Sequence, residues 1–294
     1  HRCAQEPLCL PARSPAQVSS LNTRVPLPQP YLNAIGTAVP AQDIHQPFLD
    51  WASARIADPR AAKLFGRMVA RSGLEHRWSV LPHAPGGGSA AEPGGFYGGE
   101  TLPGTAERMR MYGALAPDLS LRAIDDLGAD LSGVTHLVVA SCTGFVAPGV
   151  DQIIQRRLGL APDVERLLIG YMGCYAAAVA LRSARHIVRS EPRARVLVVT
   201  VELCSLHLHE MDEIEAMLAG LQFGDGAAAA LVTADEAGLA LGAPFSATLP
   251  ESNELIRWDI TDQGFVMALS GEVPGRIGTA LADPAMRERI VNGG

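Results

Sequence analysis

Apolar and polar positions divide the chain into short apolar runs and longer segments with helical periodicity. The apolar runs, which predict buried strands, lie at residues 134–140, 167–170, 195–201 and 227–233. Segments with helical character separate them, at residues 150–158, from Cys174 onward and at 213–221. Strands that alternate with helices predict an α/β fold in which a mostly parallel sheet is covered on both faces.

The regions on either side of this core carry weaker patterns. Upstream, the sequence predicts a strand at 31–40, helices at 48–55 and 61–71, a Gly/Pro-rich loop at 85–103, a helix that Thr105 caps, and a second helix at 118–127. Downstream of a turn at 234–238, residues 255–260 and 265–269 predict a hairpin, and a helix is expected from about 275 to 290.

These patterns divide the chain into three segments. Residues 1–30 lack periodicity and are rich in proline, so we expect a disordered arm or a non-native leader. Residues 31–236 form the main α/β unit. Residues 237–294 restart the pattern but are too few to complete a second sheet, so we expect the beginning of a second half whose remainder is truncated.

Composition and charge exclude several classes of function. The 294 residues are 48% hydrophobic and 19% charged, a globular balance with enough chain for a large core. The formal net charge of −7 argues against nucleic acid or an anionic membrane as partner. No apolar run is long enough to cross a bilayer.

Cysteine usage predicts a reducing compartment. The 5 cysteines are odd in number and have no metal-type spacing, which favours neither a disulfide framework nor a zinc site. The start of the chain also lacks the basic and apolar regions of a signal peptide. We therefore expect a cytoplasmic protein.

The candidate chemistry centres on residues 167–178. A buried strand ends at Gly170, and Cys174 then opens a helix of very small residues. The free N–H groups and the dipole at a helix start favour a thiolate, which is the nucleophilic form of cysteine. Gly173 allows a tight turn. A free cysteine that simply fills the core fits these residues equally well.

Three further stretches accompany Cys174. Residues 141–149 leave a buried strand at its carboxyl end, where ligand sites of α/β sheets lie. Residues 223–227 form a Gly-Asp-Gly turn before an apolar strand. In residues 271–277, Pro274 stands where a first-turn proline opens a helix.

Together these four stretches resemble the chalcone synthase-like family, the type III polyketide synthases. The resemblance runs from about Tyr31 to the end of the chain, and residues 72–77 and 105–109 are similar to bacterial members. It implies the thiolase-like α/β fold, with two halves layered α-β-α-β-α, of which the N-terminal half is complete here and the C-terminal half is not. It also implies a homodimer.

The resemblance further implies the chemistry. Cys174 matches the nucleophile that takes an acyl group from a coenzyme A thioester, and malonyl-CoA then extends that group by decarboxylative condensation. Coenzyme A thioesters are substrates, and no permanently bound cofactor or metal is implied. The starter, the number of extensions and the cyclisation mode are not implied.

Several positions match residues that line the cavity of relatives. Phe223 matches an aromatic gate, and Met267 replaces a second gating phenylalanine, which predicts a differently shaped cavity. Thr143, Cys204 and His207 match strand ends along the cavity. Arg71 matches a basic residue near the coenzyme A phosphates, although an arginine on a solvated helix face explains it as well.

One departure from the family concerns the oxyanion hole. Family members use a histidine and an asparagine in the second half to polarise the thioester, and each such donor lowers the barrier by roughly 2–4 kcal/mol. This chain has no histidine after His209, and Asn292 lies in the wrong sequence context. We therefore expect this chain to be incomplete as a condensing enzyme, although Cys174 could still be acylated.

Three alternatives stay open on the sequence. The alternation in residues 207–210 suggests a metal site, but a third convergent ligand is not evident, so none is expected. A β-ketoacyl carrier-protein synthase III-like enzyme would share the cysteine and the Gly-Asp-Gly turn. A non-catalytic paralogue or fragment would account for the missing histidine and asparagine.

Overall fold

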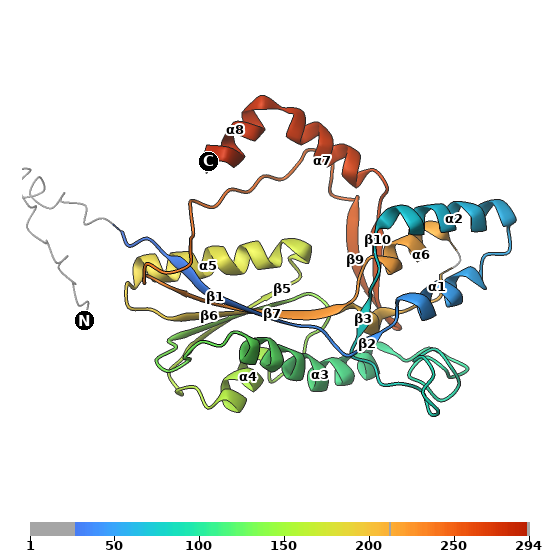
Figure 1. The fold of residues 1–294 in the computed structure, drawn as a ribbon, viewed down its shortest axis with the longest axis horizontal. Helices are drawn as coiled ribbons and strands as arrows, with labels where there is room; N and C mark the ends of the chain where they lie inside the picture. The colour runs from blue at the N-terminus through green and yellow to red at the C-terminus, as the bar shows by residue number, and fades with distance from the viewer. Residues whose placement is uncertain (1–26, 212, 293–294) are drawn as a thin grey trace, which may run out of the picture.

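A computed structural model describes residues 27–211 and 213–292 (Figure 1). Most of the arm expected at residues 1–30, including Cys3 and Cys9, lies outside these ranges. The central sheet has the strand order β5-β4-β6-β7-β1-β8. Its strands are β1 (Tyr31–Ala38), β4 (His136–Ser141), β5 (Glu165–Gly170), β6 (Val196–Leu203), β7 (Asp225–Thr233) and β8 (Leu239–Ala240).

The sheet is mixed rather than mostly parallel. β4 pairs in parallel with β5 and β6, but the β6–β7, β7–β1 and β1–β8 pairings are antiparallel. The chain leaves β6 at Leu203 and enters β7 at Asp225, and these two residues are register partners. β7 therefore starts at the edge where β6 ends and has to run back along it. The sequence patterns show that β7 is a strand but not its direction.

Helices cover both faces of the sheet. The helices α3 (Thr105–Asp126) and α4 (Val150–Leu158) lie on one face, and α5 (Ala176–Ser190) lies on the other (Figure 1). Alternate strand residues supply two separate cores: Leu137 packs with the α3 side, and Val138 packs with the α5 side. In α5, Ala180 and Ala184 are fully buried, because small side chains let the helix lie close to the sheet.

The helix α3 differs from the sequence prediction in two ways. It is one continuous helix through Pro117, where two helices were predicted, and Pro117 is buried within the packed face. Tertiary packing therefore outweighs the local cost of a proline without an N–H. Gly104, and not Thr105, is the N-cap. The Thr105 hydroxyl instead accepts a hydrogen bond from the N–H of Gly264, at 2.8 Å, in the C-terminal hairpin.

A smaller unit packs beside the sheet. It contains α1 (His45–Ser53), α2 (Pro59–Ser72), α6 (Ile214–Leu221) and the short pair β2 (Gln42–Asp43) and β3 (Trp78–Ser79). Asp58 caps α2 by accepting from the N–H groups of Arg60 and Ala61. Phe48, Phe65 and Met217 form the centre of its own buried cluster.

The last described segment adds a hairpin and two helices. β9 (Ile256–Thr261) and β10 (Gly264–Leu269) pair antiparallel, as predicted. Two helices, α7 (Val273–Ala282) and α8 (Pro284–Asn292), replace the single helix expected at 275–290, because Pro284 begins a new helix. Pro274 lies in the first turn of α7. β8, from the same predicted segment, joins the central sheet through β1.

The domain division at residues 30 and 236 stays a prediction. Within the described ranges, one central sheet lies between helical layers, and the hairpin and α7 stand beside it (Figure 1). No helix in these ranges is both long and apolar enough to cross a membrane.

Candidate active site

Cys174 lies in a tight turn between β5 and α5. Tyr171 and Gly173 have positive φ angles of 54° and 63°, so the chain reverses sharply after the strand. The predicted role of Gly173 in this turn is therefore confirmed, since glycine adopts such angles without a steric cost. A single 3₁₀ turn (Gly173–Tyr175) carries Cys174 and leads directly into α5 at Ala176. The Cys174 side chain is exposed.

The other two described thiols differ from Cys174. Burial raises the pKa of Cys142, and the nearby carboxylate of Glu202 adds to this effect. Burial also raises the pKa of Cys204 well above its usual range, with further contributions from Glu202, Asp225 and Cys174. Since the thiolate is the reactive form, these environments favour Cys174 as the reactive thiol among the described cysteines.

Glu202 organises the loop after β4 and was not singled out in the sequence. Its carboxylate accepts from the N–H of Cys142 at 2.8 Å, from the N–H of Thr143 at 3.0 Å and from the Thr143 hydroxyl at 2.6 Å. The Cys142 sulfur accepts in turn from the N–H of Gly173 at 3.1 Å. The turn that carries Cys174 is thus fixed to β4 and β6. The only sequence signal was an acidic residue in an otherwise apolar strand.

His207 is buried and holds two segments together through its ring. Its Nε2 lies 2.6 Å from the carbonyl oxygen of Thr143, and its Nδ1 accepts from the N–H of Phe265 at 3.0 Å. These partners assign the proton to Nε2. Burial lowers the pKa of His207 to about 4, so the ring is neutral at pH 7. His207 also stacks on Phe265, with ring centroids 4.4 Å apart.

Four of the candidate residues line one cavity: Cys204, His207, Phe223 and Met267. Trp258 and Phe265 of the hairpin complete its aromatic wall. Thr143 does not line the cavity. Its carbonyl oxygen accepts a hydrogen bond from His207, which does line it. The structure therefore brings together residues that are far apart in the sequence, although their roles stay predictions.

Arg77 holds the backbone of Phe223, the predicted gate residue. Arg77 was not singled out in the sequence. Its Nε donates to the carbonyl of Phe223 at 2.5 Å, and its guanidinium lies over the ring of Phe48, 4.4 Å from the centroid. Burial lowers its pKa, and the carboxylate of Asp225 opposes that shift. An arginine held from both sides fixes the backbone at the mouth of the cavity.

Asp225, in the Gly-Asp-Gly turn, is a buried acceptor. Its carboxylate accepts from the N–H and hydroxyl of Ser205, at 2.7 and 2.6 Å, and from the N–H of Val80 at 2.7 Å. Burial raises its pKa, and these hydrogen bonds oppose the rise. Asp225 therefore joins β3, β7 and the turn that carries Cys204. Its contacts are structural.

Arg71 lies apart from this cavity. It lines a separate open groove between α2 and α6, together with Met68 and Leu218. A phosphate-binding role for Arg71 stays a prediction.

In the metal-type pattern at residues 207–210, the His207 ring is already engaged. Both ring nitrogens of His207 are engaged by backbone groups. The only described group of three or more metal-type ligands lies elsewhere, at His136, Glu165 and Glu191.

Comparison with solved structures defines the fold. The C-terminal type III polyketide synthase domain of Steely1 from Dictyostelium matches with a TM-score of 0.76 and 26% identity, over 90% of this chain and 74% of that chain. The 1,3,6,8-tetrahydroxynaphthalene synthase of Streptomyces coelicolor A3(2), a bacterial type III polyketide synthase, matches with the same TM-score, identity and shares. The predicted thiolase-like α/β fold is therefore confirmed.

Sequence comparisons find similar proteins among polyketide synthases. Residues 97–236 match the family model of chalcone and stilbene synthases, N-terminal domain. The α-pyrone synthesis polyketide synthase-like Pks18 of Mycobacterium tuberculosis is 35% identical over 187 residues, which are 61% of this chain and 47% of that protein. Bisdemethoxycurcumin synthase of Oryza sativa subsp. japonica is 34% identical over 171 residues, 56% of this chain and 42% of that protein. The chain is therefore similar to chalcone and stilbene synthases, and the match to the family model covers residues 97–236.

The matched relatives are longer than this chain and come from several kinds of organism. The chain spans about half the length of the curated relatives it matches, as the 47% and 42% shares show. Bacterial, plant and Dictyostelium proteins all match, so a bacterial type stays a prediction.

Proposed function

We propose that this protein is an acyltransferase of the type III polyketide synthase class, with Cys174 as its nucleophile. The observation that carries the proposal is the arrangement of the thiols. Cys174 is exposed in a strained turn at the start of α5, whereas Cys142 and Cys204 have raised pKa values. The nearby cavity is lined mainly by apolar and aromatic side chains, which suits an acyl chain.

In the first step, the Cys174 thiolate attacks the carbonyl carbon of an acyl-CoA. A carbon–sulfur bond to Cys174 forms, the bond to the coenzyme A sulfur breaks, and coenzyme A leaves as a thiolate that takes up a proton. No redox change occurs, so the step needs no electron carrier. Coenzyme A thioesters are therefore the proposed substrates.

In the second step, malonyl-CoA loses carbon dioxide, and the electron pair of the broken bond forms an enolate. The enolate carbon attacks the acyl group on Cys174, and the carbon–sulfur bond to Cys174 breaks, which regenerates the thiolate. We propose that Phe223 and Met267 shape the cavity for the growing chain.

Intact-protein mass spectrometry after incubation with an acyl-CoA tests the first step. The wild-type chain should gain the mass of one acyl group, and peptide mapping should place it on Cys174. Cys174→Ala should lose the adduct, whereas Cys204→Ala should keep it. Undiminished acylation of Cys174→Ala would contradict the nucleophile assignment.

Carrier-protein substrates test the competing enzyme class. Strict dependence on an acyl carrier protein would favour a β-ketoacyl carrier-protein synthase III-like enzyme. The absence of an adduct from either donor would favour a non-catalytic chain. A homodimer and a cytoplasmic location, which the resemblance and the cysteine usage predict, stay part of the proposal.

A further inference from the structure

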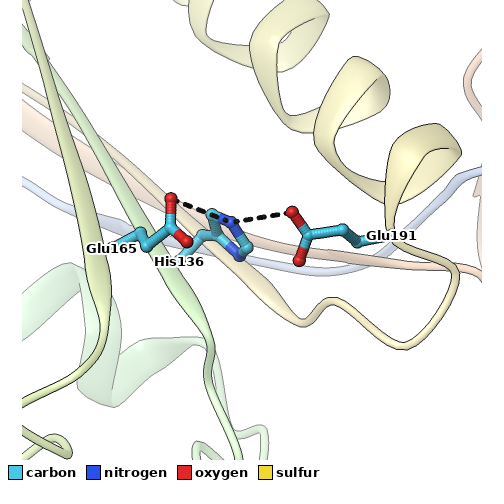
Figure 2. A group of neighbouring side chains, drawn as sticks. All are labelled: His136, Glu165 and Glu191. Carbon is cyan, nitrogen blue, oxygen red and sulfur yellow. Dashed lines mark ion pairs between the residues drawn. The ribbon is translucent and has the colours of Figure 1, made fainter.

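A group of three ligand-type side chains lies at the end of the sheet opposite Cys174 (Figure 2). His136 begins β4, Glu165 begins β5, and Glu191 follows the last residue of α5. His136 Nε2 lies 3.8 Å from Glu165 Oε2 and 4.0 Å from Glu191 Oε1, and the three ligand atoms lie within 4.8 Å of one another. Cys174 is ~17 Å away, since β5 separates the two ends of the sheet.

The histidine is buried and has one free ring nitrogen. The His136 side chain is only 8% exposed, and its Nδ1 lies 2.8 Å from the Thr135 hydroxyl. In the described part of the chain, Nε2 forms no hydrogen bond; it faces the two carboxylates, which lie at ion-pair distances (Figure 2). An imidazole nitrogen that belongs to a buried side chain, faces two acids and donates to neither is placed as a ligand atom would be.

The Thr135 hydroxyl, which lies beside Nδ1 of His136, favours the histidine tautomer that a metal requires. The Thr135 hydroxyl lies 3.3 Å from the carbonyl of Arg195 and can donate to it. It can then accept from Nδ1–H of His136, which leaves the Nε2 lone pair directed at the carboxylates. Ligating histidines usually donate their other N–H to an oxygen in this way.

The two glutamates have fixed backbones and adaptable carboxylates. The N–H of Glu165 donates to the carbonyl of Thr135 at 2.9 Å, and the N–H of Glu191 donates to the carbonyl of Ile187 at 2.7 Å. Their side chains are 75% and 59% exposed, so the carboxylates can move to meet an ion. Tetrahedral Zn²⁺ with bonds of about 2.1 Å needs ligand atoms about 3.4 Å apart, which these side chains reach by small rotations.

The local charge favours a cation. Within the described ranges, neither Glu165 nor Glu191 forms an ion pair with a lysine or an arginine. Glu191 also stands at the carboxyl end of α5, where the helix dipole carries partial negative charge. The two carboxylates therefore have no lysine or arginine as a positive partner in the described ranges.

We propose that His136, Glu165 and Glu191 form a binding site for a divalent transition-metal ion, with Zn²⁺ as the best fit. One nitrogen and two carboxylate oxygens suit zinc, whereas Mg²⁺ and Ca²⁺ prefer sites made of oxygen alone. The ion would join the first residues of β4 and β5 to the end of α5, and water would complete its coordination. It is a structural site, separate from the chemistry at Cys174.

Isothermal titration calorimetry of the full chain with Zn²⁺, after removal of metal by a chelator, tests this site. Wild type should bind one Zn²⁺ ion with an affinity that falls about tenfold or more in Glu165→Gln and in Glu191→Gln. Both variants change exposed side chains and should fold. The matched control is Glu236→Gln, an exposed glutamate in the turn after β7, which should bind as wild type does.

Two further measurements separate this site from zinc bound by cysteine. Zn²⁺ should raise the unfolding temperature of wild type and of Glu236→Gln but not of Glu165→Gln, because an ion that binds only the folded state stabilises it. The Co²⁺-loaded protein should lack sulfur-to-cobalt charge-transfer absorption, and Glu191→His should keep the site. Equal Zn²⁺ affinity in wild type and in both Gln variants would overturn the proposal and leave an ion-pair cluster only.

Discussion

The ring of His207 stacks on the ring of Phe265, with centroids 4.4 Å apart, while its Nδ1 accepts a hydrogen bond from the Phe265 N–H at 3.0 Å. Its other nitrogen contacts the carbonyl of Thr143 at 2.6 Å. One buried side chain therefore joins the loop after β4 to the C-terminal hairpin. It closes the cavity that Phe223 and Met267 also line.

His207 should make stability depend on pH. Burial lowers its folded-state pKa from 6.5 to about 4, so the unfolded chain binds more protons between these values. The contribution of His207 is therefore fully present above pH 6.5 and is lost as the pH falls towards 4. Between pH 7 and pH 5 the loss should be about 2 kcal/mol in the free energy of unfolding.

Urea unfolding at both pH values measures this effect. His207→Gln should be about 1–3 kcal/mol less stable than wild type at pH 7, because buried partners lose their hydrogen bonds. It should also lack the His207 part of the pH dependence. Exposed His186→Gln serves as the comparison for loss of a surface histidine. An unchanged pH slope in His207→Gln would contradict the buried neutral ring.

Alkylation should distinguish the described thiols. Under native conditions, iodoacetamide should modify Cys174 first, since it is exposed, while burial raises the pKa values of Cys142 and Cys204. Peptide mapping over a time course measures each site separately, and unfolding in urea should equalise the rates. Earlier modification of Cys204 than of Cys174 would contradict the environments described above.

Gly36 should not tolerate a side chain. A Cβ at this position in β1 would overlap with backbone atoms of Ala123 in α3 and of Leu127, the C-cap of that helix. Gly36→Ala should therefore lower the free energy of unfolding by about 2 kcal/mol or more. The control is Gly66→Ala in exposed α2, where a Cβ meets no atom within 4 Å. Because alanine favours helices, this control should be up to about 1 kcal/mol more stable than wild type. Equal stability of the two variants would contradict the close β1–α3 approach.

Met267 should set the size of the acyl group that the cavity accepts. Met267→Phe adds bulk to the wall of the cavity, and Met267→Ala removes it. In competition between acyl-CoAs of increasing length, loading should shift towards shorter chains in the first variant and longer chains in the second, by about tenfold. Mass spectrometry of the adducts measures the distribution. Met68→Phe, in the separate groove beside α2, should leave it unchanged.

Much of the fold could be predicted from local patterns. The strands β4, β6 and β7 and the helix α4 lie close to their predicted positions, because continuous apolar runs and helical periodicity are properties of neighbouring residues. Pro117 and Thr105 show the limit of such patterns. Packing keeps α3 helical through Pro117. The Thr105 hydroxyl accepts a hydrogen bond from the hairpin and does not cap α3.

The residues of the candidate site also fall into two groups: those that local sequence patterns predict and those that only the fold brings together. The sequence by itself determined Cys174 and its glycine turn, because a strand, a tight turn and a helix start are local features. Only the tertiary structure decided that β7 runs antiparallel, that Glu202 and Arg77 hold the loops, and that His207 meets Phe265. These relationships join residues far apart in the chain. No spacing along the sequence encodes them, because burial and long-range hydrogen bonding arise only when the chain folds.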